Sequence, residues 1–336
     1  MSQPQHLRQL NRRQILTLLF EHGRLTRPHL AELTGLSKVT VNAVVQDLVE
    51  QAAVQLSAGT SSTPGRVPCA VELHPLLATV LAIDLQSSHL RAQVHGLALQ
   101  EPQHLRLETG PDDLTTLTAG LIRELHAAPP FGPLRSVVIG LPAPVDDLGQ
   151  VGEPNALPWL DVPRLRVLAR ELTFDLRFEN DANLVTLALH ARAPEYTHFA
   201  ALIERPSGTG LGLMLGGQLY RGVHGRAGEL GRSPWPGHNA AGWEVLEQLP
   251  DTERLDATAF MLAALMHTLD LEHLVLSLRP GRMPLLERRL RGLLPPAVTL
   301  GTEPHVSRAA LHGAGLCAQK RARDRLLGSP GEEHVA

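Results

Sequence analysis

The first fifty positions of the chain place apolar and polar residues at the spacing of three short helices. Between residues 11 and 21, apolar side chains recur every three or four positions, and Gly23 follows as a stop signal. A second helix is expected after Thr26, a favourable N-cap residue, and it should end at Gly35, where positive φ costs little. Ser37 then caps a third helix that continues to residue 51.

The apolar positions divide the second and third helices into inner and outer faces. The expected inner residues are Leu30, Ala31 and Leu33, followed by Val41, Val44, Val45 and Leu48. Two helices joined by a short glycine turn are typical of a helix-turn-helix, in which the second helix enters the major groove of DNA. Short strands at 54–56 and 70–73 flank a loop rich in Gly, Ser, Thr and Pro, which is the pattern of a wing.

This arrangement gives a set of candidate DNA contacts. Short polar or cationic groups at the start of the third helix suit base edges and phosphates, and an arginine in the wing loop can reach a narrow minor groove. The candidate DNA-binding residues are Arg27, Ser37, Lys38, Thr40, Asn42 and Arg66, with Arg24 as a further backbone contact. The alternative is a small three-helix domain with a polar face, in which Arg66 is only a solvated loop charge.

Charge favours a local nucleic-acid surface. The 336 residues carry a formal net charge of −3, whereas residues 1–75 hold seven Lys or Arg against five acidic residues. Two cysteines far apart in the sequence, Cys69 and Cys317, argue against a disulfide framework. Because the sequence has neither a secretion signal nor a membrane-length apolar run, we expect a cytoplasmic protein that does not bind a membrane.

Beyond residue 75 the pattern changes to strands that end in polar or glycine-rich loops. One apolar strand run ends in the Gly/Pro loop of residues 140–144, and another ends at Asn180 and Asp181, which open a helix. At a helix N-terminus, backbone amides can hold a carboxylate and point it at a hydroxyl group. A plain helix-capping role for Asp181 is the alternative. Residues 207–218, SGTGLGLMLGGQ, form a glycine-rich loop of the kind that approaches phosphates closely.

With the winged helix, these segments make the chain resemble the ROK family of repressors and sugar kinases. The resemblance rests on GRVP, VVIGLPAPVDDLGQVGEPNALPWLDV, FENDANLVTLAL and GTGLGLMLGGQLYRGVHGRAGELG, in that order. It implies an α/β chain in which a winged helix-turn-helix domain, residues 1–75, precedes a two-lobed actin-like and hexokinase-like domain, residues 76–336. The expected first lobe is about 76–195 with a C-terminal helix at 306–327, and the second lobe, about 196–305, is shortened after residue 249.

The resemblance also implies a sugar site. Asp181 would stand at the position of the kinase base, and Arg232 stands where the family has a histidine that touches the sugar and binds zinc. Glu244 resembles the last sugar-contacting acid, although Glu247 fits almost as well. The candidate ligand-binding residues are therefore Asn155, Asn180, Asp181, Glu229, Arg232 and Glu244. Arg232 could contact a carboxylate or phosphate on a modified sugar, or simply pair with a neighbouring acid.

The phosphate-handling segments depart from those of the family's kinases. Where the kinases have an Asp-x-Gly-Gly-Thr type of turn, this chain keeps Asp84 and continues with LQSSH, so that side chains would crowd a triphosphate. A later glycine pair is replaced by Arg279-Pro280. The family's zinc-binding cysteines are missing, and we expect no metal and no cofactor. Asp181 would then be a vestigial base, and we expect no kinase activity.

These features predict a transcription regulator, most simply a repressor of carbohydrate-related genes, whose kinase-derived domain senses a small ligand. Its partners would be a double-stranded DNA operator and a small carbohydrate-like effector, and it would act as a homodimer or homotetramer. Two alternatives stay open: an ATP-dependent sugar kinase with an attached DNA-binding domain, and a ligand-independent regulator whose second domain only dimerises.

Overall fold

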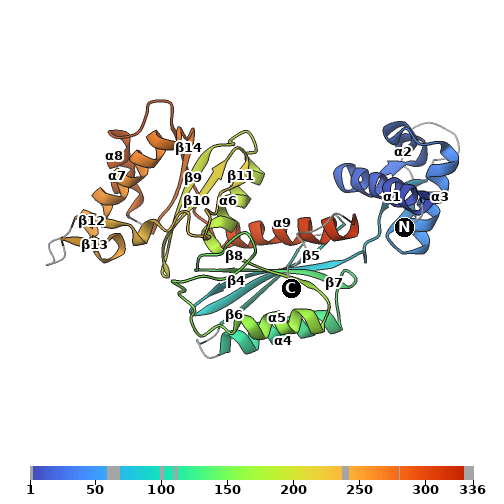
Figure 1. Ribbon diagram of the computed structural model, residues 1–336, viewed down its shortest axis with the longest axis horizontal. Helices are drawn as coiled ribbons and strands as arrows, with labels where there is room; N and C mark the ends of the chain where they lie inside the picture. Colours follow the sequence, from blue (N-terminus) through green and yellow to red (C-terminus); the bar gives the residue numbers. More distant parts are fainter. Residues whose placement is uncertain are drawn as a thin grey trace.

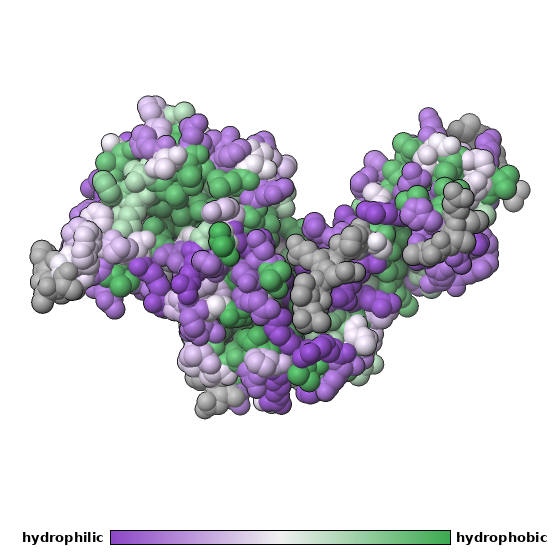
Figure 2. Space-filling model, viewed as in Figure 1, coloured by the Kyte–Doolittle hydropathy of each residue, from purple (hydrophilic) through white to green (hydrophobic). Residues whose placement is uncertain are grey.

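A small N-terminal domain stands apart from two larger lobes (Figure 1). The computed structural model describes residues 3–58, 69–98, 102–108, 110, 113–236, 242–279 and 281–328. In the space-filling view a deep gap separates the N-terminal domain from the lobes, and the connection between them lies at the base of this gap (Figure 2). In the described part of the chain no helix has the length and apolar character needed to span a bilayer.

The N-terminal domain contains three helices and a small antiparallel sheet of order β1-β3-β2. Its elements are α1 (Gln3–His22), β1 (Leu25–Thr26), α2 (Arg27–Thr34), α3 (Lys38–Glu50), β2 (Val54–Ser57) and β3 (Ala70–Leu73). The expected local signals are present, because Thr26 and Ser37 cap α2 and α3 and Gly35 has a φ of 69°. These three features confirm the predicted helix, turn and helix.

Two expectations for this domain were wrong. The first helix begins at Gln3 rather than at residue 11, because Pro4 stands in the first turn, where proline is tolerated, and no glycine or proline interrupts the residues that follow. Leu33 was expected on the inner face but is 46% exposed. The eight residues of α2 turn only Leu30 fully into the core, so Leu33 faces outward. The predicted wing contact Arg66 lies outside the described residues, which omit 59–68.

The first lobe is built on a five-stranded sheet of order β6-β5-β4-β7-β8. Its strands are β4 (Thr79–Gln86), β5 (His89–Gly96), β6 (Gln103–Glu108), β7 (Leu134–Leu141) and β8 (Asp175–Asn180). Strands β4, β7 and β8 run parallel, so that their carboxyl ends meet at one edge. Helices α4 (Leu114–Ala127) and α5 (Val162–Glu171) cover one face and bury a core of Leu, Ile and Val side chains against it.

The second lobe repeats this topology with the strand order β11-β10-β9-β14-β15. Its strands are β9 (Phe199–Arg205), β10 (Gly208–Leu215), β11 (Gln218–Leu219), β14 (His273–Ser277) and β15 (Thr299–Thr302). Helices α7 (Asp251–Leu269) and α8 (Met283–Arg291) pack on its outer face. A two-stranded ribbon, β12 (Pro234–Pro236) and β13 (Trp243–Val245), precedes α7. As the sequence predicts, one helix lies between residue 249 and β14.

Two helices fill the space between the sheets. Helix α6 (Asp181–Arg192) follows directly on β8, and α9 (Val306–Leu326) crosses it and packs on the first sheet. Both helices share one core with residues of β4, β7, β9 and β14. The far end of α9 reaches the N-terminal domain, where Leu326 and Leu327 join its core and Arg323 lies 4.8 Å from the ring centre of Phe20. Thus α9 contacts both α6 and the N-terminal domain.

Candidate functional site

The start of α3 forms an exposed polar surface on the N-terminal domain. Lys38 and Asn42 are exposed, whereas Thr40 is half-buried. Ser37 accepts a hydrogen bond from the Thr40 amide at 3.1 Å, so its hydroxyl serves the helix N-terminus. Val39, which the sequence analysis did not consider, is 78% exposed. An exposed apolar group at this position of a helix-turn-helix suits the methyl group of thymine.

The two arginines near α2 differ in their surroundings. Arg27 is half-buried, and its Nε makes no hydrogen bond to any described residue. Arg24 instead donates to Ser57 Oγ at 2.6 Å and lies 3.2 Å from Glu72 Oε2. Arg24 therefore ties the segment between α1 and β1 to β2 and β3, and this pairing competes with a phosphate contact.

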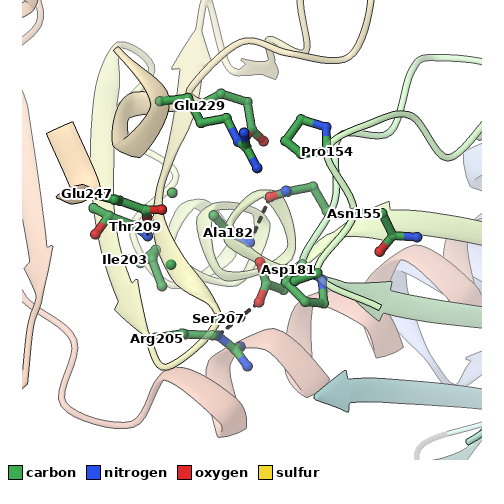
Figure 3. Close-up of a pocket in the computed structure, with 16 residues that line it drawn as sticks. Pro154, Asn155, Asp181, Ala182, Ile203, Arg205, Ser207, Thr209, Glu229 and Glu247 are labelled. Carbon is green, nitrogen blue, oxygen red and sulfur yellow. Dashed lines mark hydrogen bonds and ion pairs between the residues drawn. The ribbon is translucent and has the colours of Figure 1, made fainter. Parts of the chain in front are cut away.

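A small polar cavity of about 120 Å³ lies between the two lobes (Figure 3). The carboxyl ends of β7 and β8 and the start of α6 border it on one side, and β9, β10 and the loops after β11 border it on the other. Five of the six expected ligand-binding residues line it: Asn155, Asn180, Asp181, Glu229 and Arg232. The sixth, Glu244, lies on β13 outside the lining, whereas Glu247, the alternative at that position, lines the cavity.

Hydrogen bonds hold the two asparagines in place. Asn180, rather than Asp181, is the N-cap of α6, and its Oδ1 accepts from the amides of Ala182 and Asn183 at 2.9 and 3.1 Å. Its Nδ2 donates to the carbonyl of Ala143. The Oδ1 of Asn155 accepts from an amide two residues later at 2.8 Å, so this loop is ordered by its own side chain. The side chains of both asparagines are thus held in fixed positions along the wall of the cavity.

Asp181 is bound by a buried arginine that the sequence analysis missed. The Nε of Arg205, at the end of β9, lies 3.2 Å from Asp181 Oδ2, and its Nη1 donates to both carboxylate oxygens of Asp84 at 3.1 Å. Gln86 donates to Asp84 and Asp181 at 3.2 Å each. Burial of Arg205 disfavours its charge, but the two carboxylates outweigh this effect and raise the pKa of Arg205.

Arg205 also joins the lobes, because it belongs to the second lobe and both of its carboxylate partners belong to the first. Only 6% of Arg205 is exposed. The sequence holds one signal: Arg205 ends the run FAALIER, which is apolar up to its last two residues, and the structure buries all seven positions. A charged residue in such a strand needs a buried partner.

The glycine-rich segment 207–218 was expected to be a loop, but residues 208–215 form strand β10, because they pair in register with β9 and β11. The start of this strand is occupied by another internal charge. Glu247 accepts a hydrogen bond from the Thr209 amide and lies against Gly208 and Gly231. A Cβ at Gly231 would lie 2.3 Å from Glu247 Oε1, so glycine is needed for this approach. A carboxylate of the protein thus sits on a backbone amide that could otherwise bind an anion.

The segment that replaces the family's later glycine pair is likewise filled. The buried carboxylate of Glu204 accepts from the Arg279 amide at 3.1 Å and pairs with the guanidinium of Arg282 at 2.7 Å. Pro280 lies outside the described residues.

Glu229, which lines the cavity, has a shifted pKa. Burial raises the pKa of Glu229, the guanidinium of Arg232 opposes this, and the negative charges of Asp181 and Glu247 raise it further. The net effect is a raised pKa, which favours the protonated form of this carboxyl. The described residues contain no group of three or more His, Cys, Asp or Glu that could hold a metal ion, and the absence of zinc stays a prediction.

Comparison with known proteins shows two matching regions. Residues 80–242 match the ROK family, and residues 8–51 match a winged helix-turn-helix DNA-binding domain. A putative xylose repressor of Caldicellulosiruptor sp. (strain Rt8B.4) is 26% identical over 235 residues, which are 67% of this chain and 58% of that protein. The xylose repressor of Bacillus subtilis (strain 168) is 24% identical over 232 residues, 67% and 60% of the two chains. The chain thus spans about three fifths of the length of these relatives.

Solved structures agree in fold. A ROK family transcriptional regulator, a homologue of the E. coli MLC protein, superposes with a TM-score of 0.66 at 17% identity over 96% of this chain and 98% of that chain. A ROK hexokinase from Thermus thermophilus gives a TM-score of 0.57 at 22% identity over 73% of this chain and 99% of that chain. The predicted α/β architecture with two kinase-like lobes is therefore confirmed, and the chain joins a region that matches a winged helix-turn-helix DNA-binding domain to a region that matches the ROK family.

Proposed function

We propose that the protein is a DNA-binding transcription regulator that represses sugar-related genes in response to a small carbohydrate ligand. The observation that carries this proposal is the pairing of two features in one chain: an exposed helix start in a helix-turn-helix, and a kinase-like cleft whose base is held by the chain's own arginine. The names of the xylose repressors that resemble this chain support the same reading.

The cleft supports a sensor better than an enzyme. A general base needs a carboxylate oxygen within hydrogen-bond reach of the substrate hydroxyl, and an oxygen already engaged by a guanidinium is less available for this contact. Asp181 faces Arg205 at 3.2 Å, and Glu247 occupies the Thr209 amide. Phosphoryl transfer also needs a carboxylate free to position Mg²⁺, whereas Asp84 is bound to Arg205. We infer that the cleft binds a ligand without phosphorylating it.

Regulation would follow from linkage between ligand and DNA. A ligand that prefers one arrangement of the lobes shifts the population toward it, and DNA affinity changes by the same coupling free energy. Helix α9 offers a physical route, because it packs on α6 beside the cleft and on Phe20 in the N-terminal domain. As a homodimer or homotetramer in the cytoplasm, the protein would read half-sites about one helical turn apart.

Fluorescence anisotropy with duplexes from upstream of the protein's own gene, compared with scrambled duplexes at several salt concentrations, tests the DNA-binding part. We expect binding that depends on the DNA sequence. If Asn42 reads a base edge, Asn42→Ala should weaken this binding by about 1–3 kcal/mol and reduce the preference for the specific sequence. Lys38→Ala should weaken binding to all duplexes and reduce the salt slope by about one unit if Lys38 contacts phosphate.

The matched control is Lys320→Ala, because Lys320 is the only other lysine of the chain and lies on α9, where it pairs with Asp324. We expect this variant to bind DNA as the wild type does. If the wild type bound every duplex weakly, and Lys38→Ala and Lys320→Ala had equal effects, the proposal that the helix-turn-helix recognises a specific DNA sequence would be contradicted. Sugar-dependent ATP turnover that Asp181→Ala abolishes would favour the kinase instead.

A further inference from the structure

A groove on the first lobe gathers arginines from three separate elements. It lies between β5, the edge strand β6 and the first turn of α9, and its volume is about 400 Å³. Its polar lining consists of Arg91, Gln93, His104, Arg106 and Arg308. The described residues of this lining include neither Asp nor Glu, and none of them also lines the cavity between the lobes.

Two of the arginines stand directly opposite each other on neighbouring strands. In the antiparallel pairing of β5 and β6, Arg91 is in register with Arg106, and like charges at such positions repel each other. Glu108, the acidic residue of β6, is in register with His89, two residue pairs away. The strand pairing therefore carries an electrostatic cost that a bound anion would remove.

Arg91 has no counter-charge of its own among the described residues. It makes neither a hydrogen bond nor an ion pair with any of them, and its Nε is buried. On its other side Arg91 is in register with Asp84 of β4, but both oxygens of that carboxylate accept from Arg205. Because a half-buried guanidinium is stabilised by an acceptor, Arg91 favours an anion beside it.

Arg308 adds a third positive charge at an unfavourable place. It lies in the first turn of α9, where the helix dipole disfavours cations and where no acidic residue is present. Arg308 is exposed and makes no hydrogen bond or ion pair with a described residue. Glu303, shortly before the helix, is already engaged by Arg192 and by the amide of His305. The positive helix end and Arg308 therefore both favour an anion in the groove.

The size and position of the groove indicate which kind of anion fits. Its volume lies within the 300–1,000 Å³ that is usual for small-molecule sites, and arginine forks match the paired oxygens of a phosphate group. The phosphates of operator DNA fit less well, because the N-terminal domain contacts the last turn of α9, about 27 Å along the helix from Arg308 (Figure 1).

We propose that this groove binds the phosphate group of a small phosphorylated molecule through Arg91, Arg106 and Arg308. The site goes beyond the proposed function, which places a carbohydrate ligand in the cavity between the lobes. Because Arg91 and Arg106 belong to the first sheet and Arg308 belongs to α9, a bound phosphate joins the start of this helix to the sheet.

Isothermal titration of the full chain tests for binding, with inorganic phosphate and glycerol 3-phosphate as probes in a chloride buffer of constant ionic strength. We expect both probes to bind, glycerol 3-phosphate with a dissociation constant of about 1 mM or lower, and we expect glycerol, its uncharged counterpart, not to bind. Absence of binding of both phosphates up to about 10 mM would overturn the proposal.

Three arginine-to-glutamine variants test the residues. Arg91→Gln and Arg308→Gln should each weaken binding of glycerol 3-phosphate at least about tenfold, because each removes a hydrogen bond between charged groups. Arg123→Gln is the matched control, because Arg123 is exposed on α4, which covers the opposite face of the same sheet. Equal losses in all three variants would mean that only the net charge matters and would overturn the proposed site.

Thermal unfolding separates a lost site from a damaged fold. Since the arginines repel one another, Arg91→Gln and Arg308→Gln should be at least as stable as the wild type in chloride. Glycerol 3-phosphate should raise the Tm of the wild type and of Arg123→Gln, but not of the two groove variants. An equal rise in all four proteins would overturn the proposal. Arg308→Gln alone suffices if Arg91→Gln does not fold, because the Arg308 side chain is exposed.

Operator binding of the same variants distinguishes the two sources of phosphate. Without added phosphate, we expect both groove variants to bind operator DNA as the wild type does. Weaker operator binding in both, together with unchanged binding of glycerol 3-phosphate, would assign the arginines to the DNA backbone and would overturn the proposal.

Discussion

Replacing Gly313 by alanine tests the close crossing of α6 and α9. A Cβ at this position would lie 1.9 Å from the backbone oxygen of Leu184 and 2.7 Å from its carbonyl carbon, whereas ordinary contacts begin at 3.4 Å. The obstacle is backbone inside a layer between two sheets, so no side-chain rotation relieves it. Helix α9 would have to move away from α6, although the two helices share one core.

The expected cost follows from two opposing effects. Alanine stabilises a helix interior by about 1 kcal/mol relative to glycine. Overpacking a close contact costs about 1–3 kcal/mol, and a backbone obstacle belongs at the upper end of that range. We therefore expect Gly313→Ala to lower the free energy of unfolding by about 2 kcal/mol, which corresponds to a fall of about 4–8 °C in Tm.

Gly120→Ala is the matched control because it makes the same substitution in an open position. Gly120 lies within α4, is exposed, and a Cβ there would meet nothing within 4 Å. This variant should raise the free energy of unfolding by about 1 kcal/mol. Urea unfolding followed by circular dichroism measures both. A Gly313→Ala protein as stable as Gly120→Ala would refute the close-contact argument.

Three further predictions concern caps, protons and the contact between domains. Ser37→Ala removes the N-cap of α3 and should lower the free energy of unfolding of the N-terminal domain by about 1 kcal/mol, measured by urea unfolding. Burial, aided by two neighbouring histidines on β6 and α9, lowers the pKa of His95 to about 4. Between pH 6.5 and about pH 4, His95 is protonated in the unfolded chain but not in the native chain. The free energy of unfolding should therefore fall as the pH falls through this range, and His95→Gln should make this decline less steep. A double-mutant cycle with Phe20→Leu and Arg323→Met should give a coupling energy of about 0.5–1 kcal/mol, and a coupling of zero would show that the ring and the guanidinium do not interact.

The parts of the structure that the sequence predicts correctly are those that local chemistry determines. Thr26, Gly35 and Ser37 act through hydrogen bonds and backbone angles within a few residues, so their pattern is readable directly. The junction of β8 and α6 at Asn180 is equally local. Leu33 shows the limit, because an apolar residue in a short helix is buried only when the tertiary contact reaches it.

The charges of the cleft depend on partners far away in the sequence. Arg205 meets Asp84 across 121 positions, and no local pattern couples the two. Glu244 and Glu247 are three positions apart in the sequence. The path of the backbone after β13 brings only Glu247 to the cavity. The identity of the lining side chains was thus largely predictable, whereas the pairing that neutralises Asp181 was not.

The position of α9 in the chain has a consequence for synthesis. This helix supplies Ala309, Ala310, Ala314, Ala318 and Ala322 to the core between the two sheets, and the first-lobe strands that share this core are made more than a hundred residues earlier. During translation the N-terminal domain can bury most of its apolar residues as soon as it leaves the ribosome. The sheet of the first lobe must wait, with one face uncovered, until residues 306–326 emerge. Nascent chains arrested before residue 306 should therefore expose this apolar face and depend on chaperones, whereas a released chain that includes residues 306–326 can complete the fold.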